Sequence, residues 1–178
     1  MTRRRSLGFL IAILIGVLAT PSRAVAAVDV FLKIDGVIGE SADIQHRNEI
    51  DLLSWSWGTS TGTGKTKGGA LPPACIQDVT IMKRFDAASP QLIMNSITGT
   101  IAANGVITLR RAGGMQEQFL TLTMTSVSVV AVQIAESSDE PVESVMLHFT
   151  SMHGEYRKEV ASGVLSAPIV FDISGACN

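Results

Sequence analysis

The alternation of apolar and polar residues along this chain constrains its fold more than any other sequence feature. In the stretch EIDLLSWSWG, which spans residues 49–58, Leu53, Trp55 and Trp57 alternate with serines. Successive side chains of a β-strand point to opposite faces, so these three apolar residues share one face. A period of two is typical of a half-buried strand and argues against a helix.

The same pattern recurs between glycine, proline and acidic turns. It predicts strands over residues 28–34, 50–57, 76–82, 106–111, 118–130, 142–156 and 169–173. At Ser126 the apolar phase changes from one face to the other. We therefore expect a β-bulge or a change of packing partner there, because one extra residue re-aims every later side chain.

One helix is predicted over residues 89–97. Ser89 is expected as its N-cap, with Pro90 at the first helical position and Gly99 as its stop. Leu92, Ile93 and Ile97 have the spacing of a face that packs against a sheet. About eight strands and one short helix predict a mainly β fold, a compact barrel or sandwich with a single flanking helix.

The first 26 residues have the composition of an export signal. Arginines at positions 3–5 precede an uncharged apolar run over residues 7–19, and small residues follow up to Ala26 and Ala27. The run is shorter than the roughly 20 residues that span a bilayer as a helix. We expect cleavage after Ala26, which leaves no stable membrane span; an uncleaved anchor is the alternative.

The mature domain is then residues 27–178, and it is acidic. The whole chain has a net charge of −2, and loss of the signal removes arginines but no acidic residue. Nucleic-acid binding depends on clustered lysine and arginine, so no nucleic-acid partner is expected. The pairs Lys83-Arg84 and Arg110-Arg111 are expected on solvated turns.

The chain has two cysteines, Cys75 and Cys177. In an exported chain this even number predicts a disulfide between them. Two alternatives stay open, namely two free thiols that never meet and a bridge between neighbouring copies.

No motif for catalysis is recognised. Residues 62–66, GTGKT, resemble a phosphate-binding loop, but GxxxxGK[ST] requires glycine where the chain has Thr59. His46, His148 and His153 are expected at the surface or rim and not as metal ligands. Residues 58–62, GTSTG, match the letters of GxSxG but lie in a Gly-rich loop with no helix predicted after it, and the paired carboxylates look like strand-end and turn charges. We therefore predict no enzyme, no cofactor and no metal.

Five motifs occur here in the order and spacing of one known family. They are FLKIDGVIGES (31–41), EIDLLSWSWG (49–58), SPQL (89–92), LRRAGG (109–114) and HFTSMHGEYR (148–157). In these motifs the chain resembles the Hcp family, the tube proteins of type VI secretion systems.

The resemblance implies a small β-barrel formed by two sheets with one flanking helix. It also implies a non-enzymatic structural or carrier protein that forms six-membered, stacking rings and has effectors or other secretion-system components as partners. The loop over residues 58–73 corresponds to an extended loop that reaches a neighbouring subunit or ring. The residues that this implies as ring contacts are Trp55, Trp57, Gly58, Thr63, Lys65 and Lys67. For the two tryptophans, packing in the protein's own core is the favoured interpretation.

The export signal departs from the family, whose tubes assemble in the cytoplasm. One account is an exported Hcp-like protein located in the periplasm or outside the cell. The other is a true start near Val28 and a cytoplasmic tube subunit. An exported binding or adhesion module that uses no secretion tube is the alternative function.

Overall fold

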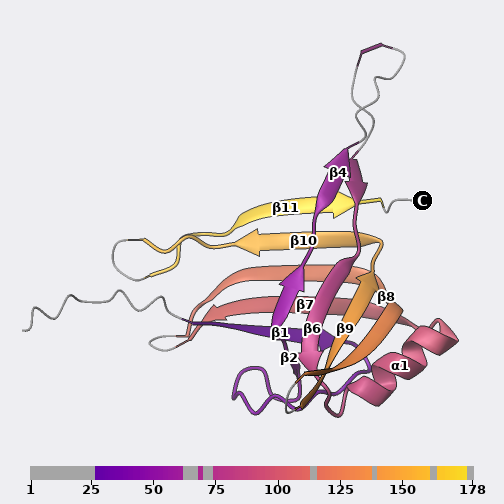
Figure 1. Cartoon of the computed structure of the whole chain (residues 1–178). Helices are drawn as coiled ribbons and strands as arrows, with labels where there is room; N and C mark the ends of the chain where they lie inside the picture. Colours follow the sequence, from indigo (N-terminus) through magenta and orange to yellow (C-terminus); the bar gives the residue numbers. More distant parts are fainter. Residues whose placement is uncertain are drawn as a thin grey trace, which may run out of the picture.

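One antiparallel sheet of nine strands makes up most of the structure, which is a computed structural model (Figure 1). It describes residues 27–61, 68–69, 74–112, 116–137, 140–160 and 164–175. The elements in chain order are β1 (Val28–Ile34), β2 (Ile50–Asp51), β3 (Ser54–Ser56), β4 (Thr59–Thr61), β5 (Ala74–Ile76), β6 (Val79–Arg84), α1 (Ser89–Thr98), β7 (Ile101–Arg111), β8 (Gln118–Ser137), β9 (Glu140–His148), β10 (Ser151–Tyr156) and β11 (Ile169–Ser174).

The large sheet bends through its longest strand, β8. Its strand order is β2-β1-β7-β8-β9-β6-β3. The second half of β8 pairs with β9, whereas its first half pairs with β10, and β11 pairs with β10. In Figure 1, β7, β10 and β11 run across the view, and β3, β6 and β9 run upward in front of them. The second sheet is the hairpin of β4 and β5, which projects beyond the body of the molecule.

The predicted irregularity at Ser126 is confirmed. β8 pairs with β10 up to Thr125 and with β9 from Ser128 onward. Ser126 lies between the two partners with a φ of 54°. The buried side chains change phase at the same point, from Leu122 and Met124 to Val127 and Val129. Of the two predicted causes, the change of packing partner is therefore confirmed, whereas the register shift of β8 against β9 lies farther along, between Val129 and Ala131.

The two ends of the sheet lie on one short stretch of chain. Only Leu52 and Leu53 separate β2 from β3. The Leu52 amide donates to Val30 at 2.9 Å, toward β1, and the Leu53 amide donates to Met82 at 2.8 Å, toward β6. The sheet thus curls back toward itself but is not closed by a ladder between its described end strands. The predicted mainly β fold of two sheets and one helix is confirmed, apart from this incomplete closure.

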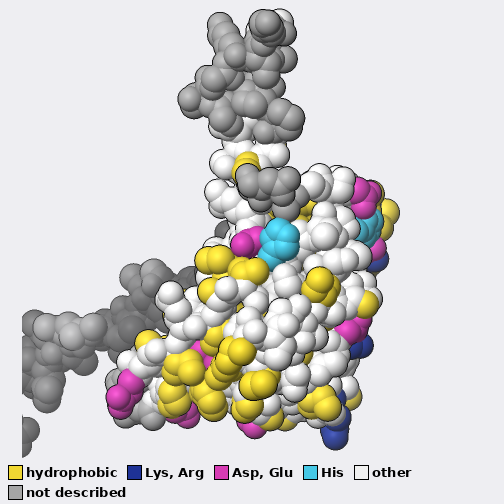
Figure 2. Space-filling view, turned by 90° about the vertical axis from the view of Figure 1, so that its right-hand side faces the viewer, with side chains coloured by type: hydrophobic (Ala, Val, Ile, Leu, Met, Phe, Trp, Pro, Cys, Tyr) yellow, Lys and Arg dark blue, Asp and Glu magenta, His cyan; other side chains and the backbone are white. Residues whose placement is uncertain are grey.

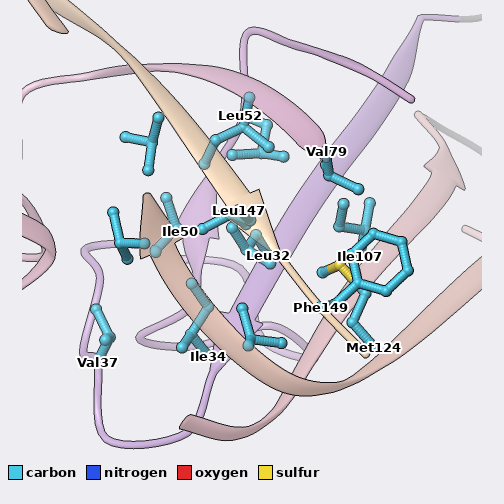
Figure 3. Close-up of a cluster of buried hydrophobic side chains, with 14 of the residues drawn as sticks. Leu32, Ile34, Val37, Ile50, Leu52, Val79, Ile107, Met124, Leu147 and Phe149 are labelled. Carbon is cyan, nitrogen blue, oxygen red and sulfur yellow. The ribbon is translucent and has the colours of Figure 1, made fainter. Parts of the chain in front are cut away.

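Hydrophobic side chains fill the space that the curled sheet encloses (Figure 3). Leu32 of β1, Ile107 of β7, Met124 of β8 and Leu147 of β9 are all fully buried there. Burial of each such side chain contributes about 1.5–3 kcal/mol. The residues come from strands far apart in the sequence, so this core holds the different parts of the curled sheet together.

Three predicted strands are each divided in the structure, and one of them, over residues 76–82, contains the last residue of β5 and the first four residues of β6. The stretch 50–57 gives β2 and β3, because the chain changes from one partner strand to another between them. The stretch 142–156 gives β9 and β10, which pair with different halves of β8. Alternation continues through both corners, so periodicity could not locate them.

The helix begins and ends almost as predicted, but its cap and its face differ. Gly99 ends α1 in the left-handed region, with φ 67°, and its amide donates to Asn95. The N-cap is Ala88, without a side-chain hydrogen bond, so the prediction of Ser89 as the cap is wrong. Leu92 is buried, whereas Ile97 is 72% exposed and does not pack on the sheet.

Candidate functional site

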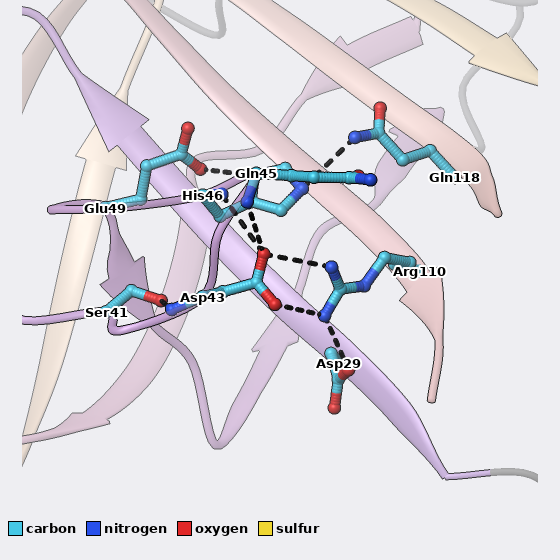
Figure 4. Close-up of polar contacts among 8 residues, drawn as sticks. All are labelled: Asp29, Ser41, Asp43, Gln45, His46, Glu49, Arg110 and Gln118. Carbon is cyan, nitrogen blue, oxygen red and sulfur yellow. Dashed lines mark hydrogen bonds and ion pairs between the residues drawn. The ribbon is translucent and has the colours of Figure 1, made fainter. Parts of the chain in front are cut away.

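A polar cluster forms where the segment before β2 folds over β1 and β7 (Figure 4). Arg110 of β7 donates two hydrogen bonds to Asp43, at 3.0 and 2.7 Å, and one to Asp29 of β1, at 3.0 Å. Asp29 and Arg110 are paired across the β1–β7 ladder. The bidentate geometry is a strong form of ion pair, and Arg110 is only 2% exposed.

This contact keeps both partners charged. The pKa of Asp43 is lowered from 3.8 to about 2, mainly by the hydrogen bond from Arg110, against desolvation, and also by hydrogen bonds from the backbone amides of Gln45 and His46. The same contact raises the pKa of Arg110. The pair therefore ties the segment before β2 to the sheet at neutral pH.

His46 is buried beside this pair, not at the surface as predicted. Its ring stacks on Phe31 with 4.1 Å between centroids and 7° between planes, and the Arg110 guanidinium lies 5.0 Å from the Phe31 centroid. Its Nδ1 lies 2.8 Å from Glu49 Oε2, and its Nε2 lies 3.1 Å from Gln118 Nε2. Alternation predicts which residues share one face of a strand. It does not predict that the segment before β2 covers the face on which Phe31 and Arg110 lie.

Gly39 allows the covering segment to fold so closely. Its amide donates to Asn48 at 2.8 Å, and the Ser41 amide donates to Glu49 at 3.0 Å. A Cβ at position 39 would lie 2.3 Å from the Glu49 carbonyl oxygen. A side chain there would force the two parts of the segment apart.

A second buried cluster joins β6, β9 and the start of α1. Lys83 Nζ lies 2.7 Å from Glu143, 2.7 Å from Asp86, 3.0 Å from Ser89 Oγ and 2.8 Å from the Arg84 carbonyl oxygen. The Ser89 hydroxyl donates to Glu143 at 2.8 Å. This use of its hydroxyl explains why Ser89 does not cap the helix.

Lys83 and Glu143 lie on the inner face of the sheet. They are paired across the β6–β9 ladder and are 0% and 1% exposed. Lys83 continues the inward phase of Val79 and Ile81, and Glu143 continues that of Val145. Glu143 Oε2 is buried without a hydrogen-bond partner within the described parts of the chain.

The expectation of solvated turns is wrong for both basic pairs, because all four residues lie in strands and one member of each pair is buried. Lys83 and Arg110 are buried, while the side chains of Arg84 and Arg111 are 65% and 41% exposed. Adjacent residues in a strand face opposite sides, so Lys83 points toward the core while Arg110 lies on the opposite face of β7, which the segment before β2 covers.

The centre of the second cluster does not have the access that catalysis requires. Ser89 lies between a lysine and a glutamate, but it is 0% exposed. A nucleophile must reach its substrate, so this serine has a structural role. Across the six described ranges, no three histidine, cysteine or acidic side chains are grouped to hold a metal ion. None of the helices in those ranges is long and apolar enough to cross a membrane.

The other two histidines lie at the surface, as predicted. His148 is paired with Asp78, and His153 is paired with Asp172 across β10 and β11. The distances from Nδ1 to the carboxylate are 2.8 and 2.7 Å. The hydrogen bond to Asp172 raises the pKa of His153.

Trp55 and Trp57 are half-buried and pack against the hydrophobic core. Trp57 also stacks on Phe171 of β11, with centroids 6.4 Å apart and planes 9° apart. The next residue, Gly58, accepts a hydrogen bond from the Gln77 amide at 3.1 Å, at the base of the projecting hairpin. Their predicted role in ring contacts stays a prediction.

Several predicted site residues cannot be placed. Ala26, Thr63, Lys65, Lys67 and Cys177 lie outside the described residues. Ala27 is exposed just before β1.

The structure describes one of the two cysteines of the predicted disulfide. Cys75 is half-buried in β5, opposite Ser60 of β4, and is disulfide-bonded. Its predicted partner, Cys177, is not among the described residues, so the pairing of these two cysteines stays a prediction.

Exposed hydrophobic side chains mark two surfaces. The edge strand β11 exposes Ile169 and Val170, at 63% and 54%. Hydrophobic side chains also gather on the lower part of the face in Figure 2, the side of the molecule that carries α1. On that side, Met94 and Ile97 of the helix are 52% and 72% exposed. Apolar surface of this kind is typical of association sites.

Comparison with known proteins decides the family. A sequence model described as "Type VI secretion system effector, Hcp" matches residues 31–156, well over half of the chain. The chain belongs to the Hcp family. Protein hcp1 of Pseudomonas aeruginosa is 36% identical over 142 residues, which cover 77% of this chain and 88% of that protein.

Solved structures agree with this assignment. A type VI secretion system effector from Yersinia pestis is 30% identical, with a TM-score of 0.69, over 83% of this chain and 100% of that one. Hcp1 from Salmonella typhimurium is also 30% identical, with a TM-score of 0.67, over 83% of this chain and 94% of that one. The predicted resemblance to the Hcp family is confirmed. The family match begins within β1 and ends with β10, so it contains the Lys83–Glu143 cluster and the Arg110–Asp43 pair, but neither Asp29 nor β11.

Proposed function

We propose that this Hcp chain is a non-enzymatic structural and carrier protein that assembles into rings of six copies related to the type VI secretion tube. The observation that best supports this proposal is the family match over residues 31–156, which includes nearly all of the curled sheet and the helix. Partners would be further copies of the chain, and effector proteins or other secretion-system components.

The projecting hairpin is the proposed contact between copies. All three residues of β4 are exposed, and the hairpin stands away from the sheet (Figure 1). A two-stranded hairpin is at best marginally stable by itself, so a neighbouring subunit would stabilise it. The proposed contact residues are Trp55, Trp57, Gly58, Thr63, Lys65 and Lys67.

We also propose that the chain is exported and cleaved after Ala26. The signal-like composition of residues 1–26 supports this proposal. The same composition favours the second candidate function, an exported binding or adhesion module that acts in the periplasm or outside the cell without a tube. A true start near Val28 would instead give a cytoplasmic subunit.

Native mass spectrometry of the protein isolated from its own cells tests these proposals together. We expect assemblies of six subunits, each beginning at Ala27. A monomer at every concentration contradicts the ring, and a subunit that keeps residues 1–26 contradicts cleavage. Tubes seen by electron microscopy support the tube function, whereas exported single rings that do not stack favour the second candidate.

Charge reversal tests the contact residues. The double variant Lys65→Glu/Lys67→Glu should leave a folded protomer that no longer assembles. Arg47→Glu is the matched control, because Arg47 is an exposed cation on a loop outside the hairpin. Unchanged assembly of the double variant would exclude the hairpin lysines as contacts.

A further inference from the structure

Strand β11 ends one side of the large sheet with an uncovered edge (Figure 1). Among the described strands it pairs with β10 alone, so its other edge has no partner strand there. Ile169 and Val170 lie on opposite faces of β11 and are 63% and 54% exposed. Native proteins usually protect a free edge with charges, proline or a covering segment. An edge strand with exposed apolar side chains on both faces is therefore suited to receive another strand.

The ladder between β10 and β11 shows which backbone groups lie at this free edge. The Gly175 amide donates to the Thr150 carbonyl oxygen at 3.3 Å, one step beyond the last β10–β11 pair. In an antiparallel ladder, every second residue of a strand exchanges hydrogen bonds with the partner strand. The odd-numbered residues of β11 therefore bond to β10. The N–H and C=O groups of Val170 and Asp172 point toward the free edge.

Strand β4 has a free edge of its own in the second sheet. That sheet has two strands, and β4 pairs with β5 alone in the described part of the chain. The Gln77 amide donates to the Gly58 carbonyl oxygen at 3.1 Å, one step before the first β4–β5 pair. By the same alternation Ser60 bonds to β5, while the backbone groups of Thr59 and Thr61 face outward. All three residues of β4 are exposed, and the hairpin stands away from the body of its own copy (Figure 1).

A ring requires two different surfaces on each copy that fit each other. A contact in which one surface meets the same surface of a second copy ends at a dimer, whereas a head-to-tail contact gives a ring when its rotation closes. The outward edges of β4 and β11 are two different surfaces of this kind. The two strands do not pair with each other within one copy.

We propose that β4 of one copy pairs with the free edge of β11 of the next copy. The two-stranded sheet of one subunit then continues the large sheet of its neighbour. The contact supplies partners for the outward backbone groups of Val170 and Asp172, and it places the threonines of β4 beside the apolar side chains of β11. This inference rests on the proposed ring function and names the surface that receives the hairpin.

Proline substitution tests the pairing, because proline removes a backbone N–H without adding a charge. The experiment uses the full-length gene product after natural processing. Val170→Pro removes an outward N–H of β11 and keeps the hydrogen bonds to β10, and Thr59→Pro does the same for β4 and β5. Val170→Ala and Thr59→Ala are the matched controls, because they change the same side chains and keep the N–H. Native mass spectrometry should show six-subunit assemblies for the wild type and both alanine variants, and loss of assembly for each proline variant.

Hydrogen exchange locates the contact and checks the folding of the variants. In the assembled wild type, the Thr59 and Val170 amides should exchange at least about fivefold more slowly than in the diluted monomer, which is the effect of one net hydrogen bond. Exchange in β6 and β9 reports global unfolding and should be equal in all variants. The wild-type measurement needs no substitution, so it tests the pairing independently of how the proline variants fold.

Two results overturn the pairing. One is that both proline variants fold and assemble as well as their alanine controls. The other is a wild-type assembly that leaves the Thr59 or Val170 amide unprotected, as in a dimer in which β11 pairs with itself. Failure of the ring function looks different, because the wild type is then monomeric at every concentration. A ring that forms with either amide unprotected keeps the ring function and refutes only the contact between β4 and β11.

Discussion

Replacing Lys83 by methionine removes the cation at the centre of the buried cluster that joins β6, β9 and α1. Methionine keeps most of the length and the apolar stem of lysine, so the change tests charge more than volume. The variant leaves Glu143 with one remaining hydrogen bond, from the Ser89 hydroxyl to Oε1, while Oε2 already has no partner within the described structure.

The expected loss follows from the burial of the partner that remains. Glu143 is 1% exposed, so water does not replace the lost ammonium group. Removal of one member of a buried ion pair typically costs about 3–5 kcal/mol. Asp86 also loses its ion pair with Lys83 at 2.7 Å, but its side chain keeps a hydrogen bond from the Ala88 amide. We therefore expect Lys83→Met to lower the free energy of unfolding by about 3–5 kcal/mol.

Guanidinium unfolding at fixed protein concentration and pH 7 gives the measurement, with an unchanged m value as the check on two-state behaviour. Arg84→Met is the matched control, since Arg84 is the next residue of β6 and is paired with Glu140, with both side chains mostly exposed. It should cost less than about 1 kcal/mol. The double variant Lys83→Met/Glu143→Leu should recover most of the loss, because neither buried charge remains.

Two results would refute this reasoning. Lys83→Met could cost no more than Arg84→Met, in which case the buried pair would contribute no more than an exposed one. The double variant could instead lose the sum of the two single variants, which would show that the lysine and Glu143 are not energetically coupled.

Three further predictions use other contacts. The pKa of Asp43 is lowered to about 2, so its ion pair stabilises the fold above about pH 4 and is lost as the pH falls toward 2; Asp43→Asn should flatten that part of the unfolding free-energy profile. Gly39→Ala should cost about 1–3 kcal/mol in chemical unfolding, because its Cβ would meet the backbone, whereas Gly58→Ala, with an ordinary contact at 3.4 Å, should cost less. The pKa of His153 is raised by Asp172, so this contact stabilises β11 fully below pH 6.5 and is lost as the pH rises through the folded-state pKa. In the wild type, hydrogen exchange of β11 should then accelerate with pH by more than the intrinsic exchange rate does, and in Asp172→Asn it should not. Equal pH profiles for the two proteins would contradict this prediction.

Periodicity and turn residues predicted much of the fold. β1 has the predicted bounds, the helix begins at Ser89 as expected, and Gly99 ends it. The change of phase at Ser126 correctly marked where β8 exchanges one partner strand for another. These features are local, because backbone conformation and alternation depend on residues close together in the chain.

The buried polar clusters were predicted poorly, although one signal was present. Lys83 continues an inward-facing series in β6, and Glu143 continues one in β9. Their burial could have been read from that phase, but a pair of basic residues is more often solvated. Nothing local indicated the burial of Arg110, which a segment distant from β7 in the sequence covers, or of His46, which belongs to that segment and stacks on Phe31 of β1.

The sequence by itself thus determined most of the strand content, though not β4 within the predicted loop 58–73, together with the helix, the faces of most strands and, through its motifs, the Hcp family. Only the tertiary structure decided which charged residues are buried, where the strands divide at corners, how far the curled sheet closes, and that Trp57 packs on Phe171. The physical reason is that alternation assigns a side chain to one face of a strand. What covers that face is decided by contacts between residues far apart in the chain.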